Sequence, residues 1–110
     1  MAERRTDVPA QLPIPWEQLE QFCRKWGVAE VSLFGSVLRD DFGPDSDVDV
    51  LVRYAPDVQP SLLDHVDKEE ELAAIFGRPV DLVSRKAVEE SRNPYRRRSI
   101  LDSARVVYAA

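Results

Sequence analysis

The sequence predicts a single α/β (α+β) domain, a small mixed β-sheet flanked by helices in the element order αβαβαβα. Its 110 residues are enough for one compact domain with one core. Segments of helical periodicity alternate with short β-type segments, which is typical of mixed architectures. Apolar residues make up 44% and charged residues 32%, as in globular proteins, and no apolar run could cross a membrane. We expect residues 16–105 to form the core and residues 1–12 a flexible lead.

The first two elements are a helix over residues 16–26 and a strand over residues 28–34. Gly27 ends the helix and Gly35 ends the strand. The helix has one apolar face, formed by Trp16, Leu19, Phe22, Cys23 and Trp26. Because Cys23 lies within that face, we expect it to be a buried apolar residue rather than a reactive thiol.

A turn-rich segment separates this strand from a second strand over residues 47–53. Residues 36–39 can form a short helix, and a loop rich in Asp, Gly, Pro and Ser follows. The alternation of side chains along a strand places Val48, Val50 and Val52 on one face of this second strand. The residues on its other face are Asp47, Asp49 and Leu51.

A second helix is expected to begin near Ser61 and to end at Phe76. Ser61 followed by Asp64 is a capping pattern, and Gly77 is a stop signal. The predicted buried side consists of Leu62, Leu63, Val66, Leu72, Ala73 and Phe76. The predicted solvent side consists of Asp64, Asp67, Lys68, Glu69, Glu70 and Glu71. His65 has no Cys or second His near it in the sequence, so we expect a surface histidine rather than a metal ligand.

The rest of the chain is predicted to add a strand over residues 79–84, a basic helix over residues 95–103 and an edge strand over residues 106–108. Asp81 is the one acid in the apolar strand 79–84. A lone carboxylate is costly to bury unless it is paired or binds a metal. Asp81 is therefore expected either at an exposed strand end or in a functional site.

The turn at Gly35 and Ser36 and the acids Asp47 and Asp49 together predict a site for a nucleotide and its metal ion. Backbone N–H groups of a small-residue turn bind anions, and carboxylates bind divalent cations. Gly35 permits close approach of the backbone to phosphates, and Ser36 can donate from its amide and hydroxyl. Arg39 can neutralise a phosphate oxygen. Either feature alone would be a weak signal, since Gly-Ser is often a plain turn.

Strand direction predicts that a third carboxylate joins this site. The turn follows one strand and the acids begin the next, so the two meet only if these strands are antiparallel. A helical crossover then makes the third strand parallel to the second, which brings Asp81 to the same sheet end. Three carboxylates at one place repel each other unless cations neutralise them. We therefore expect divalent metal ions to be held by Asp47, Asp49 and Asp81.

Charge is distributed unevenly along the chain, whose formal net charge is -5. Residues 1–84 hold 8 Lys and Arg against 17 Asp and Glu, whereas residues 85–110 hold 7 against 3. The overall acidity argues against general nucleic-acid binding. The basic segment, which contains Arg96, Arg97 and Arg98, is interpreted first as a solvated helix face. The alternatives are that this segment covers the acidic part of the chain, contacts an acidic partner or contacts RNA.

The motif Gly35-Ser36, followed after ten residues by Asp47-Val48-Asp49 and by Asp81 in a later strand, resembles the nucleotidyltransferase fold of the DNA polymerase beta superfamily. Within it the chain is similar to the minimal nucleotidyltransferases over about residues 16–105, including the run Gly77–Val83. The resemblance implies that the catalytic and metal-binding residues, which hold two Mg²⁺ ions, are Asp47, Asp49 and Asp81. It implies that ATP is the substrate and that its phosphates are bound by Gly35, Ser36 and Arg39.

The resemblance further implies a cytoplasmic protein adenylyltransferase that acts as an antitoxin. It would transfer AMP from ATP to a hydroxyl, typically of a tyrosine, on a HEPN-domain ribonuclease toxin and form a hetero-oligomer with it. One alternative is a binding module that masks the toxin without catalysis, which the uneven charge favours. Another is a nucleotidyltransferase acting on a small molecule, such as an aminoglycoside, or on an RNA end. We rank this last, because such enzymes usually carry an added domain for the acceptor.

Overall fold

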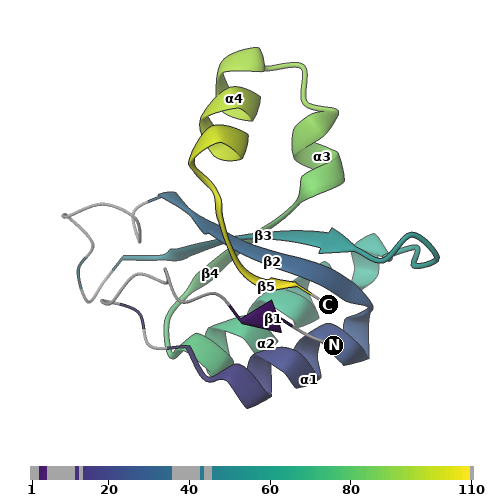
Figure 1. Cartoon of the computed structure of the whole chain (residues 1–110), viewed down its shortest axis with the longest axis vertical. Coiled ribbons are helices and arrows are strands. Elements are labelled where there is room, and N and C mark those ends of the chain that lie inside the picture. The colour runs from purple at the N-terminus through teal and green to yellow at the C-terminus, as the bar shows by residue number, and fades with distance from the viewer. Residues whose placement is uncertain (1–2, 5–11, 13, 36–42, 44–45, 110) are drawn as a thin grey trace.

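The computed structural model describes residues 3–4, 12, 14–35, 43 and 46–109 and has the mixed architecture expected from the sequence (Figure 1). Its elements in chain order are β1 (Glu3–Arg4), α1 (Trp16–Trp26), β2 (Val28–Phe34), β3 (Val48–Tyr54), the 3-10 helix η2 (Leu62–Asp64), α2 (His65–Phe76), β4 (Val80–Ser84), α3 (Arg85–Glu89), α4 (Pro94–Ser103) and β5 (Arg105–Ala109). The expected helices and strands are confirmed within a few residues of their bounds. The short helix expected over residues 36–39 lies outside the described residues.

The five strands form one mixed sheet in the order β1-β5-β2-β3-β4. Strand β2 is antiparallel to both β3 and β5, whereas β3 is parallel to β4. These directions confirm the antiparallel and parallel pairings expected for the second and third predicted strands. The prediction that the last strand is an edge strand is wrong, because β1 pairs with the outer side of β5.

The segment predicted as a flexible lead contributes to the fold at two places. Glu3–Arg4 forms β1 opposite Tyr108 and Ala109. Leu12 is buried in the main core and is only 2% exposed. The structure therefore departs from the prediction at these residues. A two-residue strand and one isolated leucine carry no periodic pattern that sequence reasoning could detect.

Helices cover both faces of the sheet (Figure 1). Helices α1 and α2 pack on one face around the main core, and Val48, Val50 and Val52 of β3 belong to that core. Helices α3 and α4 lie over the other face. There a smaller core forms, and its buried residues are Phe34, Leu51, Val88 and Ile100. The alternation predicted for β3 is thus confirmed, with its valines on the α1 and α2 side and Leu51 on the α4 side.

The buried face predicted for the second helix is partly wrong. Leu62 and Leu63 are 92% and 90% exposed, and Val66 is 60% exposed. The two leucines belong to the 3-10 helix η2, whose tighter turn does not continue the buried stripe of α2. The buried residues of α2 are spaced four apart and are Lys68, Leu72 and Phe76.

Lys68 is the residue that the solvent-side prediction placed incorrectly, since it is only 2% exposed. Its ammonium group donates a hydrogen bond to the Tyr54 hydroxyl at 3.0 Å. It also lies 4.6 Å from the centroid of the Tyr54 ring and 5.2 Å from that of Trp26. The aromatic rings and the hydroxyl replace water around the charge, so the long apolar stem can occupy a core position.

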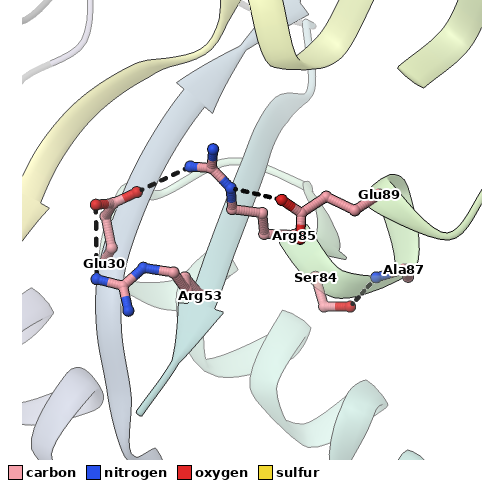
Figure 2. A network of polar contacts seen from close by, with 6 residues as sticks. All are labelled: Glu30, Arg53, Ser84, Arg85, Ala87 and Glu89. Carbon is pink, nitrogen blue, oxygen red and sulfur yellow. Dashed lines mark hydrogen bonds and ion pairs between the residues drawn. The ribbon is translucent and has the colours of Figure 1, made fainter. Parts of the chain in front are cut away.

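Helix α3 has no counterpart among the sequence predictions. Its N-cap is Ser84, whose hydroxyl accepts a hydrogen bond from the Ala87 amide at 3.1 Å. Arg85 ties the helix to the sheet, since its guanidinium lies 3.4 Å from Glu30 on β2 (Figure 2). Within the helix, the same guanidinium lies 3.4 Å from Glu89. Five residues are too few to show a helical period, which is why the sequence pattern does not indicate this helix.

Within the described part of the chain, no helix combines the length and the apolar character that a membrane span requires.

The thiol of Cys23 is predicted to resist alkylation in the folded protein. Cys23 is 2% exposed, and burial, with a smaller contribution from Glu20, raises its pKa to about 12. Because the thiolate is the reactive form, labelling by iodoacetamide at pH 8 should be at least about a hundredfold slower in native buffer than in urea. Mass spectrometry of the single cysteine measures both rates, and equal rates would contradict the buried assignment.

Candidate active site

Three strand ends meet at one end of the sheet and bring candidate residues together. Strand β2 ends at Phe34, while β3 and β4 begin nearby. In the strand ladders Phe34 is opposite Asp49, and Asp49 is opposite Asp81. Paired strands are about 4.8 Å apart, and residues opposite each other project from the same face. Asp49 and Asp81 are therefore adjacent carboxylates, at the sheet end where strand direction predicted them.

The sheet face that carries these acids is the one covered by α4. Asp49 is half-buried and lies two residues before Leu51, which packs with Ile100 of α4. Asp47 is exposed and immediately precedes β3. Asp81 is exposed as well, so its presence in β4 does not require compensation for burial. Its position opposite Asp49, rather than burial, makes it a candidate.

Gly35 lies directly beside the Asp49 carboxylate. A Cβ atom added to Gly35 would overlap the carboxylate oxygen of Asp49. The backbone of Gly35 also has φ of 76°, a left-handed conformation that other residues adopt only at an energetic cost. Both observations indicate that this position needs a glycine and that the backbone after β2 comes close to the acidic site.

Two residues of the predicted site, Ser36 and Arg39, lie outside the described residues. Their contribution to phosphate binding stays a prediction.

Arg78 is a residue of this region that sequence reasoning missed. Its guanidinium donates hydrogen bonds to the backbone carbonyls of Gly43 at 2.6 Å and Ser46 at 3.4 Å. The Ser46 hydroxyl in turn accepts a hydrogen bond from the Gly43 amide at 3.0 Å. Arg78 thus fastens the turn that leads into Asp47 to the segment that leads into Asp81. The sequence feature that could have indicated a role for Arg78 is its position in the run Gly77–Val83, three residues before Asp81.

The donor set of the site suits a magnesium ion that is shared with a phosphate ligand. Mg²⁺ is commonly held by one or two carboxylates together with substrate phosphates and waters. Asp49 and Asp81 supply two such carboxylates, and the backbone of Gly35 lies close beside that of Asp49. Across the residues that the structure describes, no three His, Cys, Asp or Glu side chains form a metal cage. The structure therefore brings Asp49 and Asp81 together, but it does not group them with Asp47 into one three-carboxylate cluster.

A groove of about 700 Å³ opens beside Gly35, between the end of β2 and the segment from α4 to β5. A second hollow of about 700 Å³ lies at the opposite end of the sheet and includes Arg53 and Arg85. There Glu30 lies 3.7 Å from Arg53 and 3.4 Å from Arg85, and Glu89 lies 3.4 Å from Arg85 (Figure 2). Lys86 also lines this second hollow, so cationic side chains line both. The groove beside Gly35 is the candidate ligand site because it adjoins the strand end that carries Asp49.

Comparison with known proteins gives concordant matches. The model of the family "Nucleotidyltransferase domain" matches residues 17–107. The protein adenylyltransferase MntA of Thermococcus cleftensis is 42% identical over 70 residues, which cover 64% of this chain and 69% of the relative. A solved structure assigned to a minimal nucleotidyltransferase is 32% identical, covers 81% of this chain and 85% of its own, and has a TM-score of 0.60. A toxin-antitoxin crystal structure with AMP-PNP has a TM-score of 0.67 at 17% identity, covering 88% of this chain and 75% of that chain, and shows a shared fold.

Replacement of Gly35 by alanine is predicted to destabilise the protein by about 1–3 kcal/mol, because the new Cβ is strained and displaces the Asp49 carboxylate. Gly43→Ala is the matched control, since a Cβ there would meet nothing within 4 Å. Urea unfolding followed by circular dichroism measures both variants. Equal stability of the two variants would contradict the close approach.

Replacement of Arg78 by methionine is predicted to lower the free energy of unfolding by about 1–3 kcal/mol, because two carbonyls lose a charged donor. Arg92→Met is the control, as Arg92 is exposed. Urea unfolding midpoints give the comparison, and an Arg78→Met midpoint equal to that of the control would show that the hydrogen bonds contribute nothing.

Proposed function

This chain belongs to the nucleotidyltransferase domain family, and on that premise we propose that it transfers AMP from ATP to a hydroxyl group of a partner protein. The observation that carries the proposal is the register that sets Asp49 opposite Asp81, with Gly35 against Asp49. Carboxylates and a close-approaching glycine turn are the parts that an ATP-magnesium complex requires.

The proposed reaction is a displacement at the α-phosphorus of ATP. The acceptor oxygen forms a bond to this phosphorus, the bond to the bridging oxygen of the β-phosphate breaks, and pyrophosphate leaves. Asp47, Asp49 and Asp81 would hold the magnesium ions, which when bound would supply positive charge to stabilise the transition state. Asp81 also accepts the proton of the attacking hydroxyl, because it is exposed and lies at the open edge of the sheet.

Gly35 and the following turn orient the phosphates in this proposal. The missing side chain lets backbone amide groups approach the phosphate oxygens, and amides that point at an anion stabilise it. Arg78 keeps the chain before Asp47 in place, which fixes the carboxylates relative to the phosphates. Ser36 and Arg39 contribute a hydroxyl donor and a positive charge, as the sequence predicts.

For the acceptor we propose a tyrosine of a HEPN-domain toxin, which makes the chain an antitoxin. Support comes from the name of the Thermococcus relative, a protein adenylyltransferase, and from the matching fold of a toxin-antitoxin structure solved with AMP-PNP. Modification of a ribonuclease tyrosine adds a negatively charged group, which would repel an RNA phosphate backbone.

The test is incubation of the protein with Mg²⁺, ATP labelled in its α-phosphate and the product of the adjacent gene. Label is expected on a tyrosine of that product. Asp49→Asn should reduce the rate by about a thousandfold or more, since several kcal/mol of transition-state stabilisation are lost. Asp57→Asn is the matched control, because Asp57 is exposed in the loop after β3.

Equal labelling by the wild type and the Asp49→Asn variant would overturn the catalytic assignment. If Asp49→Asn protects cells from the toxin as well as the wild type does, the result instead supports the masking alternative. A growth rescue assay in a strain that expresses the toxin distinguishes the two outcomes.

A further inference from the structure

Exposed apolar side chains gather at one corner of the molecule, where η2 leads into α2. In the described part of the chain four large apolar side chains are exposed, and three of them fall within five residues, namely Leu62 at 92%, Leu63 at 90% and Val66 at 60%. The fourth, Tyr95, belongs to α4. Single apolar residues are common on protein surfaces, whereas a contiguous group indicates a surface that binds another molecule.

A hollow of about 220 Å³ adjoins this group and extends it toward the edge of the sheet. Its walls come from η2 and α2 on one side and from β4 and α3 on the other, and its apolar lining includes Leu62, Leu82, Val83 and Ala87. The hollow is large enough for one leucine or phenylalanine side chain. Pockets of this kind receive the apolar anchor residues of protein partners.

The hollow reaches the strand that carries Asp81. Strand β4 is at the edge of the sheet, and its residue Val83 lines the hollow. Asp81 and Val83 are two residues apart on this strand, so they project from the same face with their Cα atoms roughly 7 Å apart. A molecule that fills the hollow therefore lies close to the candidate active site.

The open edge of β4 is partly closed to strand addition. The Leu82 amide, between these two residues, donates a hydrogen bond to the Glu69 carboxylate at 2.8 Å. A partner that added a further strand to the sheet would find this backbone donor already bonded. Side-chain contacts in the hollow are therefore the favoured mode of binding.

Charge around the exposed group indicates the kind of partner. Residues 57–71 hold six Asp and Glu against one lysine, which is buried. Asp67 and Glu70 are exposed on α2 beside the apolar group. Basic residues occur on the α3 side of the hollow and include Arg85 and Lys86. The α2 side is therefore acidic.

An acidic border around an apolar group excludes several occupants. It repels nucleic acids and anionic membranes, and two copies of the same acidic surface repel each other. A protein that surrounds an apolar anchor with lysines or arginines is complementary to it, since interfaces combine an apolar centre with a polar border.

We propose that the surface formed by Leu62, Leu63, Val66 and the adjoining hollow, here named the leucine surface, docks the protein that supplies the acceptor hydroxyl. The partner inserts an apolar side chain into the hollow and places basic side chains against Asp67 and Glu70. It then lies along the edge of β4, which brings its hydroxyl to Asp81. The proposal rests on the proposed function and gives the acceptor protein a binding surface of its own.

The experiment measures binding of the chain to the product of the adjacent gene by isothermal titration calorimetry, without nucleotide. Leu62→Gln and Leu63→Gln should each weaken binding by about tenfold, equivalent to about 1.4 kcal/mol, because an apolar contact is lost. Tyr95→Gln is the matched control, since Tyr95 is 86% exposed and lies outside the leucine surface, and its binding should stay within about twofold. Urea midpoints of the leucine variants should equal that of the wild type, because both side chains are exposed.

Charge reversal tests the acidic border. Asp67→Lys should weaken binding by about fivefold and reduce its dependence on salt, because attraction to basic residues becomes repulsion. Glu90→Lys is the matched control, since Glu90 is exposed at the end of α3 and the change in net charge is the same. In the transfer reaction the leucine variants should raise KM for the acceptor by about tenfold and leave kcat within about twofold.

The outcomes separate this proposal from the proposed function. If the wild type transfers AMP while the leucine and Asp67 variants bind the partner as the wild type does, the docking proposal is wrong and the function stands. If the leucine variants lose binding but the wild type transfers no AMP, the docking surface stands and the proposed function fails. Absence of binding by the wild type would overturn the docking proposal. So would dimerisation of the chain alone that Leu62→Gln and Leu63→Gln abolish in analytical ultracentrifugation, because it would assign the surface to a second copy.

Discussion

The parallel pairing of β3 with β4 is the constraint on which the rest of the site depends. It sets Asp49 directly opposite Asp81, although 31 residues and helix α2 separate them in the sequence. Two carboxylates at neighbouring ladder positions repel each other, and a bound cation removes that repulsion. The crossover through α2 makes the strands parallel, because a helical connection returns the chain to the same end of the sheet. The arrangement thus places two like charges side by side, and in the proposed function a metal-nucleotide complex would offset their repulsion.

Other features of the molecule maintain this juxtaposition. The antiparallel pairing of β2 with β3 brings Gly35 against Asp49 on the side away from Asp81. Because Gly35 has no Cβ, the Asp49 carboxylate can occupy the space beside it. Arg78 binds the carbonyls of the turn before Asp47, so the starts of β3 and β4 are held together by a side chain as well as by the ladder. The core formed by Phe34, Leu51 and Ile100 anchors α4 above the same face, which creates the groove beside Gly35.

Much of this arrangement could be predicted from the sequence, because the helices and strands that carry the candidate site have clear local sequence patterns. The apolar face of α1, the alternation in β3 and the acids at the strand starts give both topology and candidate residues. The burial of Leu62, Leu63 and Lys68 was predicted wrongly for a common reason. The polarity of a residue predicts its burial only when its position around the helix axis is known. The 3-10 turn shifts that position, and two aromatic rings make a lysine acceptable in the core. Helix α3, strand β1 and the role of Arg78 depend on tertiary contacts that leave no periodic trace.

The most direct measurement of the central claim is the number of Mn²⁺ ions bound per chain in the presence of a non-hydrolysable ATP analogue, counted by electron paramagnetic resonance. The wild type should bind two ions in a nucleotide-dependent manner, and Asp49→Asn and Asp81→Asn should each lose at least one ion. Binding by Asp57→Asn should equal that of the wild type. Unchanged ion binding in the Asp49 and Asp81 variants, or none in the wild type, would contradict the claim that these paired carboxylates form a metal-nucleotide site.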